Sequence, residues 1–227
     1  VQHPHGGTEA CEQAPLLRQS LIATLGRMGD PAVLAEARRR FAALDSNPEA
    51  LDGPQKFVWL GVVAQYADPA AWDKLRAMAN SAPTALEKSQ LFGLLGRAKD
   101  EALSAKALDL ALTDEPGKTT SAAIISAVSV DHAMQAVDFA LAHWDQYSAL
   151  IDVSARTQAM ARLGGGSSDL AMADKLNAYA DQHLTPESRK VTDRAIATIR
   201  TRVATWARLK PEITAWLNGK QGVKAGK

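Results

Sequence analysis

The chain has 227 residues, 46% of them hydrophobic and 5% aromatic, and its 26 Lys and Arg residues against 25 Asp and Glu residues give a formal net charge of +1. This composition can bury a core and excludes disorder as the default state. The balanced charge provides no global field that selects nucleic acid or an anionic membrane. No apolar run approaches the roughly 20 residues of a membrane span, so we expect a soluble protein without nucleic-acid partners.

The first residues, 1–13, contain "VQHPHGG" and are expected to be a linker or an expression remnant outside the fold. They show no secretory signal, so the compartment stays open between cytoplasm and periplasm. The single Cys11 has no second cysteine for an intramolecular disulfide. Because Ala is abundant and Gly and Pro fall mostly between apolar-periodic segments, the chain is predicted to be all-α.

The first predicted helix pair is "LLRQSLIATLGRM" followed by "GDPAVLAEARRRF". Asp is a strong helix N-cap and Pro suits the first helical position, so Asp30 and Pro31 predict the start of the second helix. Similar phrases recur at intervals of 31 to 38 residues, marked by Asp30, Asp68, Asp100, Asp131 and Asp169. An Ala stands two residues after each marker, and we expect this small side chain to let the paired helices approach closely. The phrase "LGR" also occurs twice, at Leu25 to Arg27 and at Leu95 to Arg97.

Helix pairs that recur at this spacing are typical of an α-solenoid, in which each pair buries its apolar face on the next. The sequence therefore predicts a HEAT-like α-solenoid over residues 14–217, ended by a long closing helix that begins at Thr185 to Glu187. Pro211 is expected to interrupt this helix, and a short restart would place three apolar residues against the preceding repeat: Ile213, Trp216 and Leu217. Residues 218–227 are predicted to be a disordered tail.

No motif in the sequence supplies chemistry. No His-Glu-x-x-His or clustered Cys and His residues predict a metal site, and no Gly-x-Ser-x-Gly turn predicts a nucleophile. The glycines of "LGGGSSD", residues 163–169, follow a helix rather than a strand and lack the Gly-Lys-Ser/Thr ending, so a helix end with a turn is favoured over a phosphate loop. The five Trp residues are expected mostly in the core. We therefore predict neither catalytic nor metal-binding residues.

The run "RRR" at Arg38 to Arg40 is expected to be a solvated helix face. An alternative is that the second helices of the repeats line the concave side of the solenoid, where extended ligands bind. Four basic residues on these helices would then contact a peptide or another domain: Arg38, Arg39, Lys74 and Lys106.

The order of segments resembles the C-terminal α-helical domain of zinc aminopeptidases related to aminopeptidase N, puromycin-sensitive aminopeptidase and the endoplasmic-reticulum aminopeptidases. The matching phrases are "LLRQSLIATLGRMGDPAVLAEARRRF", "AHWDQYSAL" and "RAIATIRTRVATWARLKPEITAWL". Together they span about residues 14–217. These are packing motifs, so they identify the domain better than an activity.

The resemblance implies a non-catalytic helical domain that caps the active-site cavity of a zinc aminopeptidase and controls peptide access. That family's catalytic domain carries His-Glu-x-x-His, a further Glu ligand and Gly-x-Met-Glu-Asn, none of which occurs in this sequence. We therefore expect no activity and no cofactor in the isolated chain, and zinc in the catalytic domain of the parent enzyme. The expected partners are that catalytic domain and the peptide substrate, and the Ala-rich composition suggests a bacterial source.

A second hypothesis stays open. The chain would then be a free-standing α-solenoid scaffold that binds a peptide or a protein on its concave face. Binding to a zinc-peptidase catalytic domain, as against tight binding to an unrelated partner, separates the two hypotheses.

Overall fold

The chain is helical throughout most of the part that the structure describes. The computed structural model covers residues 8–51 and 53–224, and the side chains of residues 14–47, 49–51 and 53–219. It is 79% helical, with twelve α-helices and no strand among the described residues. The predicted all-α, solenoid-like fold of helix pairs is confirmed. Residues 1–7, part of the predicted linker, lie outside the described part.

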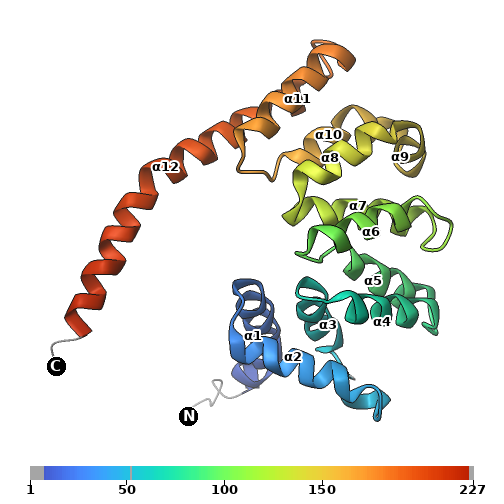
Figure 1. Cartoon of the computed structure of the whole chain (residues 1–227), viewed down its shortest axis with the longest axis vertical. Coiled ribbons are helices and arrows are strands. Elements are labelled where there is room, and N and C mark those ends of the chain that lie inside the picture. The colour runs from blue at the N-terminus through green and yellow to red at the C-terminus, as the bar shows by residue number, and fades with distance from the viewer. Residues whose placement is uncertain (1–7, 52, 225–227) are drawn as a thin grey trace, which may run out of the picture. The chain divides into compact units, whose positions relative to one another are not determined.

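The chain divides into two compact units, Val1–Val128 and Ser129–Lys227, where we expected one domain. The first unit contains α1 (Thr8–Met28), α2 (Pro31–Ala43), the short 3-10 helix η1 (Pro48–Leu51), α3 (Lys56–Gln65), α4 (Pro69–Asn80), α5 (Ala85–Leu95), α6 (Glu101–Ala111) and most of α7 (Lys118–Asp131) (Figure 1).

The second helix of each pair in the first unit begins at its predicted Asp. Asp30 accepts hydrogen bonds from two amides in the first turn of α2, both at 3.0 Å, and Asp68 and Asp100 cap α4 and α6 at 2.8 to 2.9 Å. Before Asp30, Gly29 has a φ of 78°, the left-handed conformation that glycine favours at helix ends. The amide of Asp30 also donates to the carbonyl of Leu25 at 3.0 Å. The Gly-Asp pair therefore ends one helix and starts the next.

The repeated "LGR" phrase places a glycine where one first helix contacts the next. A Cβ on Gly26 of α1 would lie 2.4 Å from Cγ2 of Val62 in α3, and a Cβ on Gly96 after α5 would lie 2.6 Å from the carbonyl oxygen of Ile124 in α7. Only a hydrogen fits at either position. Our explanation of the recurrent Ala was wrong for four of the five positions, which are exposed at the helix starts: Ala32, Ala70, Ala102 and Ala171. These glycines, rather than the alanines, permit the close approach between helices.

The second unit contains α8 (Ala133–Ala142), α9 (Trp144–Leu150), the 3-10 helix η2 (Val153–Gln158), α10 (Ala159–Gly164), α11 (Leu170–His183) and α12 (Lys190–Lys224) (Figure 1). Asp169 caps α11 as predicted, at 2.9 Å from the amide of Ala171. Asp131 does not cap α8, because α7 continues through it and His132 takes the cap position. The core of this unit includes four side chains with no exposed surface: Met160, Met172, Leu176 and Ile199.

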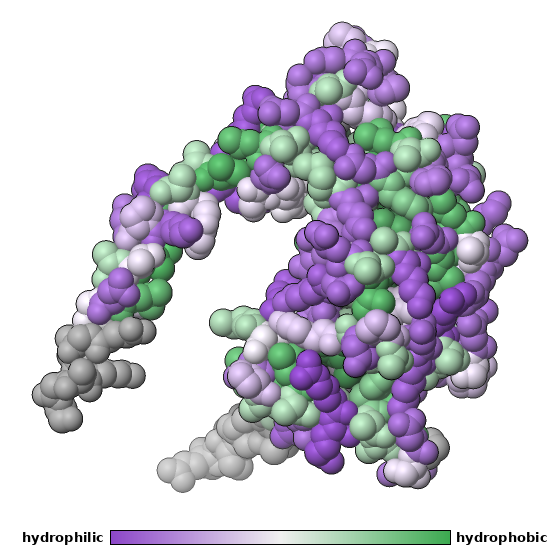
Figure 2. Space-filling view, in the orientation of Figure 1, coloured by the Kyte–Doolittle hydropathy of each residue, from purple (hydrophilic) through white to green (hydrophobic). Residues whose placement is uncertain are grey.

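The last helix differs from the prediction in three ways. It begins at Lys190, because residues 186–189 form a turn, and it runs through Pro211 without a break. Its first half packs on α10 and α11. The residues that we expected against the preceding repeat are instead 43% exposed at Ile213, 59% at Trp216 and 50% at Leu217. Figure 2 shows apolar surface along this distal half of α12, between hydrophilic residues.

The helices extend past both limits of the predicted domain. Residues 8–13 belong to α1, and residues 218–224, the described part of the predicted disordered tail, belong to α12. The domain limits 14–217 stay a prediction. In the described residues we find no helix whose length and apolar character suit a membrane span.

Candidate functional site

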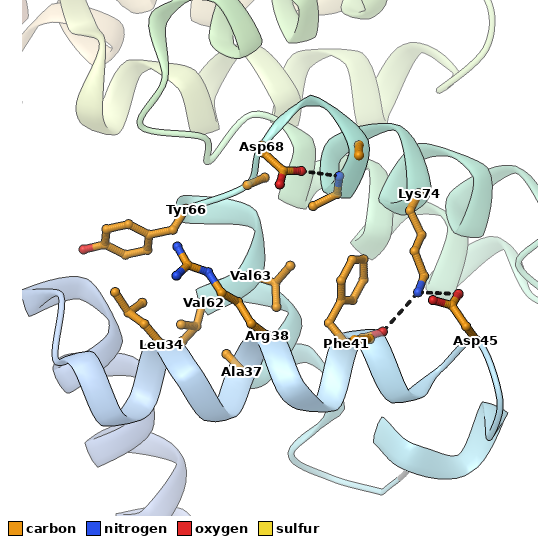
Figure 3. A pocket seen from close by; sticks show the side chains of 14 residues that line it. Leu34, Ala37, Arg38, Phe41, Asp45, Val62, Val63, Tyr66, Asp68 and Lys74 are labelled. Atoms are coloured by element: carbon orange, nitrogen blue, oxygen red, sulfur yellow. Dashed lines mark hydrogen bonds and ion pairs between the residues drawn. The ribbon is translucent and has the colours of Figure 1, made fainter.

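A groove of about 370 Å³ lies in the first unit between α2 and α4, with α3 at its base (Figure 3). Both α2 and α4 pack on α3, and the groove separates their facing sides. The turn from Tyr66 to Asp68, which joins α3 to α4, closes one end of it. Asp30 and Asp68 cap the helices on its two sides, α2 and α4, so this groove is a product of the repeat.

The floor of the groove is apolar. Ala37 and Phe41 of α2 and Val62 and Val63 of α3 line it, and each is no more than 7% exposed. They form part of the core of the unit, so the floor is fixed by the same packing that stabilises the helices. A floor of this kind suits an apolar side chain of a ligand.

Four charged side chains line the walls, and three of them are engaged. Asp68 caps α4 through the amide of Ala71. Lys74 donates to Oδ1 of Asp45 at 2.7 Å and to the carbonyl of Phe41 at 3.0 Å, and its ammonium lies 4.6 Å from the centre of the Phe41 ring.

The fourth charged group, Arg38, is exposed and forms no hydrogen bond or ion pair with any residue that the structure describes. Figure 3 shows Arg38 extending from α2 toward α3, with its guanidinium on the side of Tyr66. The free charge of the groove is therefore positive, and a guanidinium pairs well with a carboxylate.

Of the four basic residues proposed from the sequence, the structure brings Arg38 and Lys74 together at this groove. Arg39 turns away from it and donates to both carboxylate oxygens of Glu36, at 2.7 and 2.8 Å. Hydrogen bonds from Arg39 and then from Arg40 lower the pKa of Glu36 from 4.5 to about 2. This cluster is an ion-pair network on the surface of α2.

Lys106 also lies outside the groove. Its ammonium donates to Oδ1 of Asp73 at 2.6 Å and lies 4.4 Å from the centre of the Trp72 ring. This arrangement repeats that of Lys74, which joins α4 to the end of α2 as Lys106 joins α6 to α4. The two lysines therefore connect successive second helices, and Arg38 is the one of the four basic residues that forms no hydrogen bond or ion pair with any described residue.

Tyr66 follows α3 and lines the groove, and it was not among the residues predicted from the sequence. Its hydroxyl accepts a hydrogen bond from Lys99 at 2.7 Å and donates to the carbonyl of Arg27 at 3.3 Å. The only available signal was its position just before the Ala-Asp turn, where a side chain faces the gap between two helix pairs.

The glycine turn after α10 offers acceptors rather than anion-binding amides. Arg202 of α12 donates through Nη1 to the carbonyl of Gly166 at 2.9 Å and to the carbonyls of Gly165 and Ser167. The helix ends at Gly164, so the prediction of a helix end with a turn is confirmed. Within the described part of the chain, no three His, Cys, Asp or Glu side chains come together to hold a metal ion. The side chain of Cys11 lies outside that part.

An exposed apolar face lies on α1. We define the α1 stripe as Leu17, Leu21, Leu25 and Met28, which follow at helical spacing and are 38% to 78% exposed. The opposite side of α1 packs on α3. Exposed apolar residues that form a continuous face commonly mark an interaction site.

The fold is an all-helical domain in which a groove lies between two second helices and an exposed apolar stripe lies on α1. The profile of the ERAP1-like C-terminal domain family matches residues 7–201, which is most of the chain. The chain therefore belongs to the ERAP1-like C-terminal domain family, as the sequence resemblance implied. No curated protein matches the chain. The α1 stripe and the groove lie inside the matched region, and the exposed distal half of α12 lies beyond it.

Proposed function

We propose that this chain acts as the non-catalytic C-terminal domain of a zinc metallo-aminopeptidase, in which it caps the active-site cavity and controls peptide access. The match to the ERAP1-like C-terminal domain over residues 7–201 carries this proposal. The catalytic domain of the parent enzyme supplies the zinc and the hydrolytic residues. The isolated chain binds to that domain and hydrolyses nothing.

The α1 stripe is the docking surface for the catalytic domain. Leu17 and Leu21 are 61% and 50% exposed and lie on one face of a helix whose other face is already packed. Burial of these side chains in an interface removes apolar surface from water, at about 25 cal/mol per Å². The proposal thus explains why an otherwise costly apolar face is present in the matched region.

The groove between α2 and α4 contacts the peptide substrate. Phe41, Val62 and Val63 provide an apolar seat, and Arg38 pairs with an acidic group of the peptide. Lys74 acts through Asp45, since its ammonium is already bound to that carboxylate. Arg39 and Lys106 take part only as exposed charges near the domain surface.

A binding experiment tests the docking surface. The chain is titrated with the separately produced zinc catalytic domain of its own parent enzyme, and the Kd is measured by calorimetry. The double change Leu17→Glu with Leu21→Glu is expected to weaken binding at least about tenfold, because two charges enter an apolar interface. Leu86→Glu is the matched control, since Leu86 is 71% exposed on α5 and lies off the stripe.

Two results would contradict the proposed function. One is the absence of binding by the unaltered chain at concentrations of about 100 µM. The other is peptidase activity of the chain alone together with tightly bound, stoichiometric zinc. If the stripe variant and the control variant weaken binding to the catalytic domain equally, the α1 stripe is not the docking surface. That result would not contradict the proposed role as the C-terminal domain of an aminopeptidase.

A second candidate is a free-standing scaffold that binds a peptide or protein partner, and the groove with its unpaired Arg38 favours it. The same titration separates the candidates. A scaffold would not bind the catalytic domain, and its binding to its own partner would be abolished by Arg38→Gln.

A further inference from the structure

A second cavity, of about 310 Å³, lies in the second unit. It is formed where the ends of α8 and α11 meet the start of α9 and the 3-10 helix η2, and its lining includes Leu141, Trp144, Arg156, Thr157, Tyr179 and His183. No element of the first unit takes part in it.

Aromatic rings form the walls of this cavity. Tyr179 and His183, one turn apart on α11, have ring centres 5.0 Å apart and planes inclined by 30°. Trp144 at the start of α9 provides a third ring. Tyr179 is 9% exposed, so its ring is fixed by the surrounding core. Flat rings held in this way favour a planar ligand group, which stacks with an offset on their faces.

Arg156 of η2 provides the charge. Its Nε is buried and has no hydrogen-bond partner in the described part of the chain. A buried donor without an acceptor lowers the stability of the folded state by about 1 to 3 kcal/mol, and by more when the group is charged. Because Arg156 lies at the wall of a cavity, its unpaired Nε indicates that a ligand supplies the acceptor.

The acidic residue nearest in sequence does not fill this role. Asp152 lies one turn earlier and caps η2, where its Oδ1 accepts hydrogen bonds from the amide and the hydroxyl of Ser154 at 2.8 and 2.5 Å. Those hydrogen bonds, and to a smaller extent the charge of Arg156, lower the pKa of Asp152. Among the described residues that line the cavity, none is acidic. The charge presented to a ligand is therefore positive.

We propose that this cavity is a binding site for a small aromatic carboxylate. The ring of the ligand stacks between Trp144 and the Tyr179–His183 pair, and its carboxylate accepts hydrogen bonds from the guanidinium of Arg156, including the buried Nε, and from the hydroxyl of Thr157. The volume is at the small end of the range for ligand pockets and holds one ring with a short acidic arm. This site does not depend on the aminopeptidase assignment.

The test uses 3-phenylpropionate as the probe and its amide as a neutral analogue of the same shape. Each is titrated into the full chain while the indole N–H signal of Trp144 is followed by NMR. Saturable shifts with the acid are expected below about 10 mM, and the amide is expected to bind at least about tenfold more weakly. No saturation with the acid, or equal binding of the amide, would overturn the proposal.

Variants locate the site. Arg156→Gln is expected to weaken the binding of 3-phenylpropionate at least about tenfold and to leave the binding of its amide unchanged. Arg162→Gln is the matched control, because Arg162 is exposed on α10 and its guanidinium bonds to Gln158 outside the cavity. Equal affinity in Arg156→Gln and the unaltered chain would overturn the proposal. If Arg156→Gln does not fold, Thr157→Val at the exposed rim replaces it in the test. Thr157→Val is expected to bind 3-phenylpropionate several-fold more weakly. Unchanged binding by this variant would contradict the proposed site.

Discussion

The two compact units differ in how their helices are held together. In the first, successive pairs use the same devices: an Asp cap at the start of the second helix, glycines at the contacts between first helices, and a Lys that joins one second helix to the preceding one. In the second, α8 starts without an Asp cap, α9 and η2 interrupt the pairing, and α12 is 35 residues long. The first unit is thus held by the same few devices repeated along the chain, and the second by less regular packing, in which α10 contacts α8, α11 and α12.

The largest expected effect lies in the long helix of the second unit. Ile199→Ala is predicted to lower the free energy of unfolding by about 2 to 4 kcal/mol, because Ile199 is fully buried against the unit core. Ile213→Ala, in the same helix, is predicted to change it by less than about 0.5 kcal/mol, since Ile213 is 43% exposed. Urea unfolding of both variants measures the difference. Equal losses would show that the distal half of α12 is packed as firmly as the proximal half.

The second-largest change in stability is expected at the close contact of Gly96 in the first unit. Gly96→Ala is predicted to destabilise the chain by about 1 to 3 kcal/mol, because the new methyl would lie 2.6 Å from the backbone oxygen of Ile124. Gly93→Ala in α5 has open space around its Cβ and is predicted to stabilise by about 0.5 to 1 kcal/mol through helix propensity. Opposite signs in thermal unfolding are expected, and the same sign at both positions would contradict the close approach of α5 and α7.

The Asp caps compare the two units directly. Asp100→Ala is predicted to cost about 1 kcal/mol, because the first turn of α6 loses two hydrogen bonds to its carboxylate. Asp131→Ala, at the corresponding marker, is predicted to cost less than about 0.5 kcal/mol, because Asp131 ends α7 and caps nothing. Chemical denaturation at pH 7 measures the free energy of unfolding of both variants. A larger loss of stability in Asp131→Ala than in Asp100→Ala would show that Asp131 caps a helix.

The smallest effect depends on pH. Glu115 accepts hydrogen bonds from Arg76 and Asn80, at 2.8 Å from Arg76 Nε, and its pKa falls from 4.5 to about 2, mainly through Arg76. Because the folded pKa is the lower one, this stabilisation is present above pH 4.5 and is lost as the pH falls toward 2. Glu115→Gln is expected to cost about 1 kcal/mol at pH 7. Unfolding curves from pH 7 to pH 3 should show a shrinking difference, and a constant difference would contradict the lowered pKa.

Features coded locally were predictable from the sequence. The helix pairs, four of the five caps and the turn after α10 follow from residues that act on their immediate neighbours. Asp131 failed because α7 continues through Asp131 itself, so that His132 takes the cap position of α8. The sequence of α12 indicated a helix but not which of its apolar side chains have a partner. Trp206, one of the five Trp residues expected mostly in the core, is 56% exposed.

The candidate sites were predictable only in part. Arg38 and Lys74 line the groove, whereas Arg39 and Lys106 do not, although all four lie on second helices. A helix rotates successive side chains by about 100°, so only one face of it lines the groove. Ion pairing decides which charges are available to a ligand, and pairs such as Lys74 with Asp45 join residues far apart in the chain. The cavity around Arg156 combines α8, α9, η2 and α11, so no short motif marks it.

The most direct measurement for the central claim is to sequence the source locus upstream of the codon for Val1. We expect an open frame that encodes His-Glu-x-x-His with a downstream Glu, the motif of the zinc-binding catalytic domain that we propose this chain caps. A start codon immediately before Val1, with no such peptidase encoded nearby, would contradict the account and leave the groove of Arg38 as the binding site of an independent scaffold.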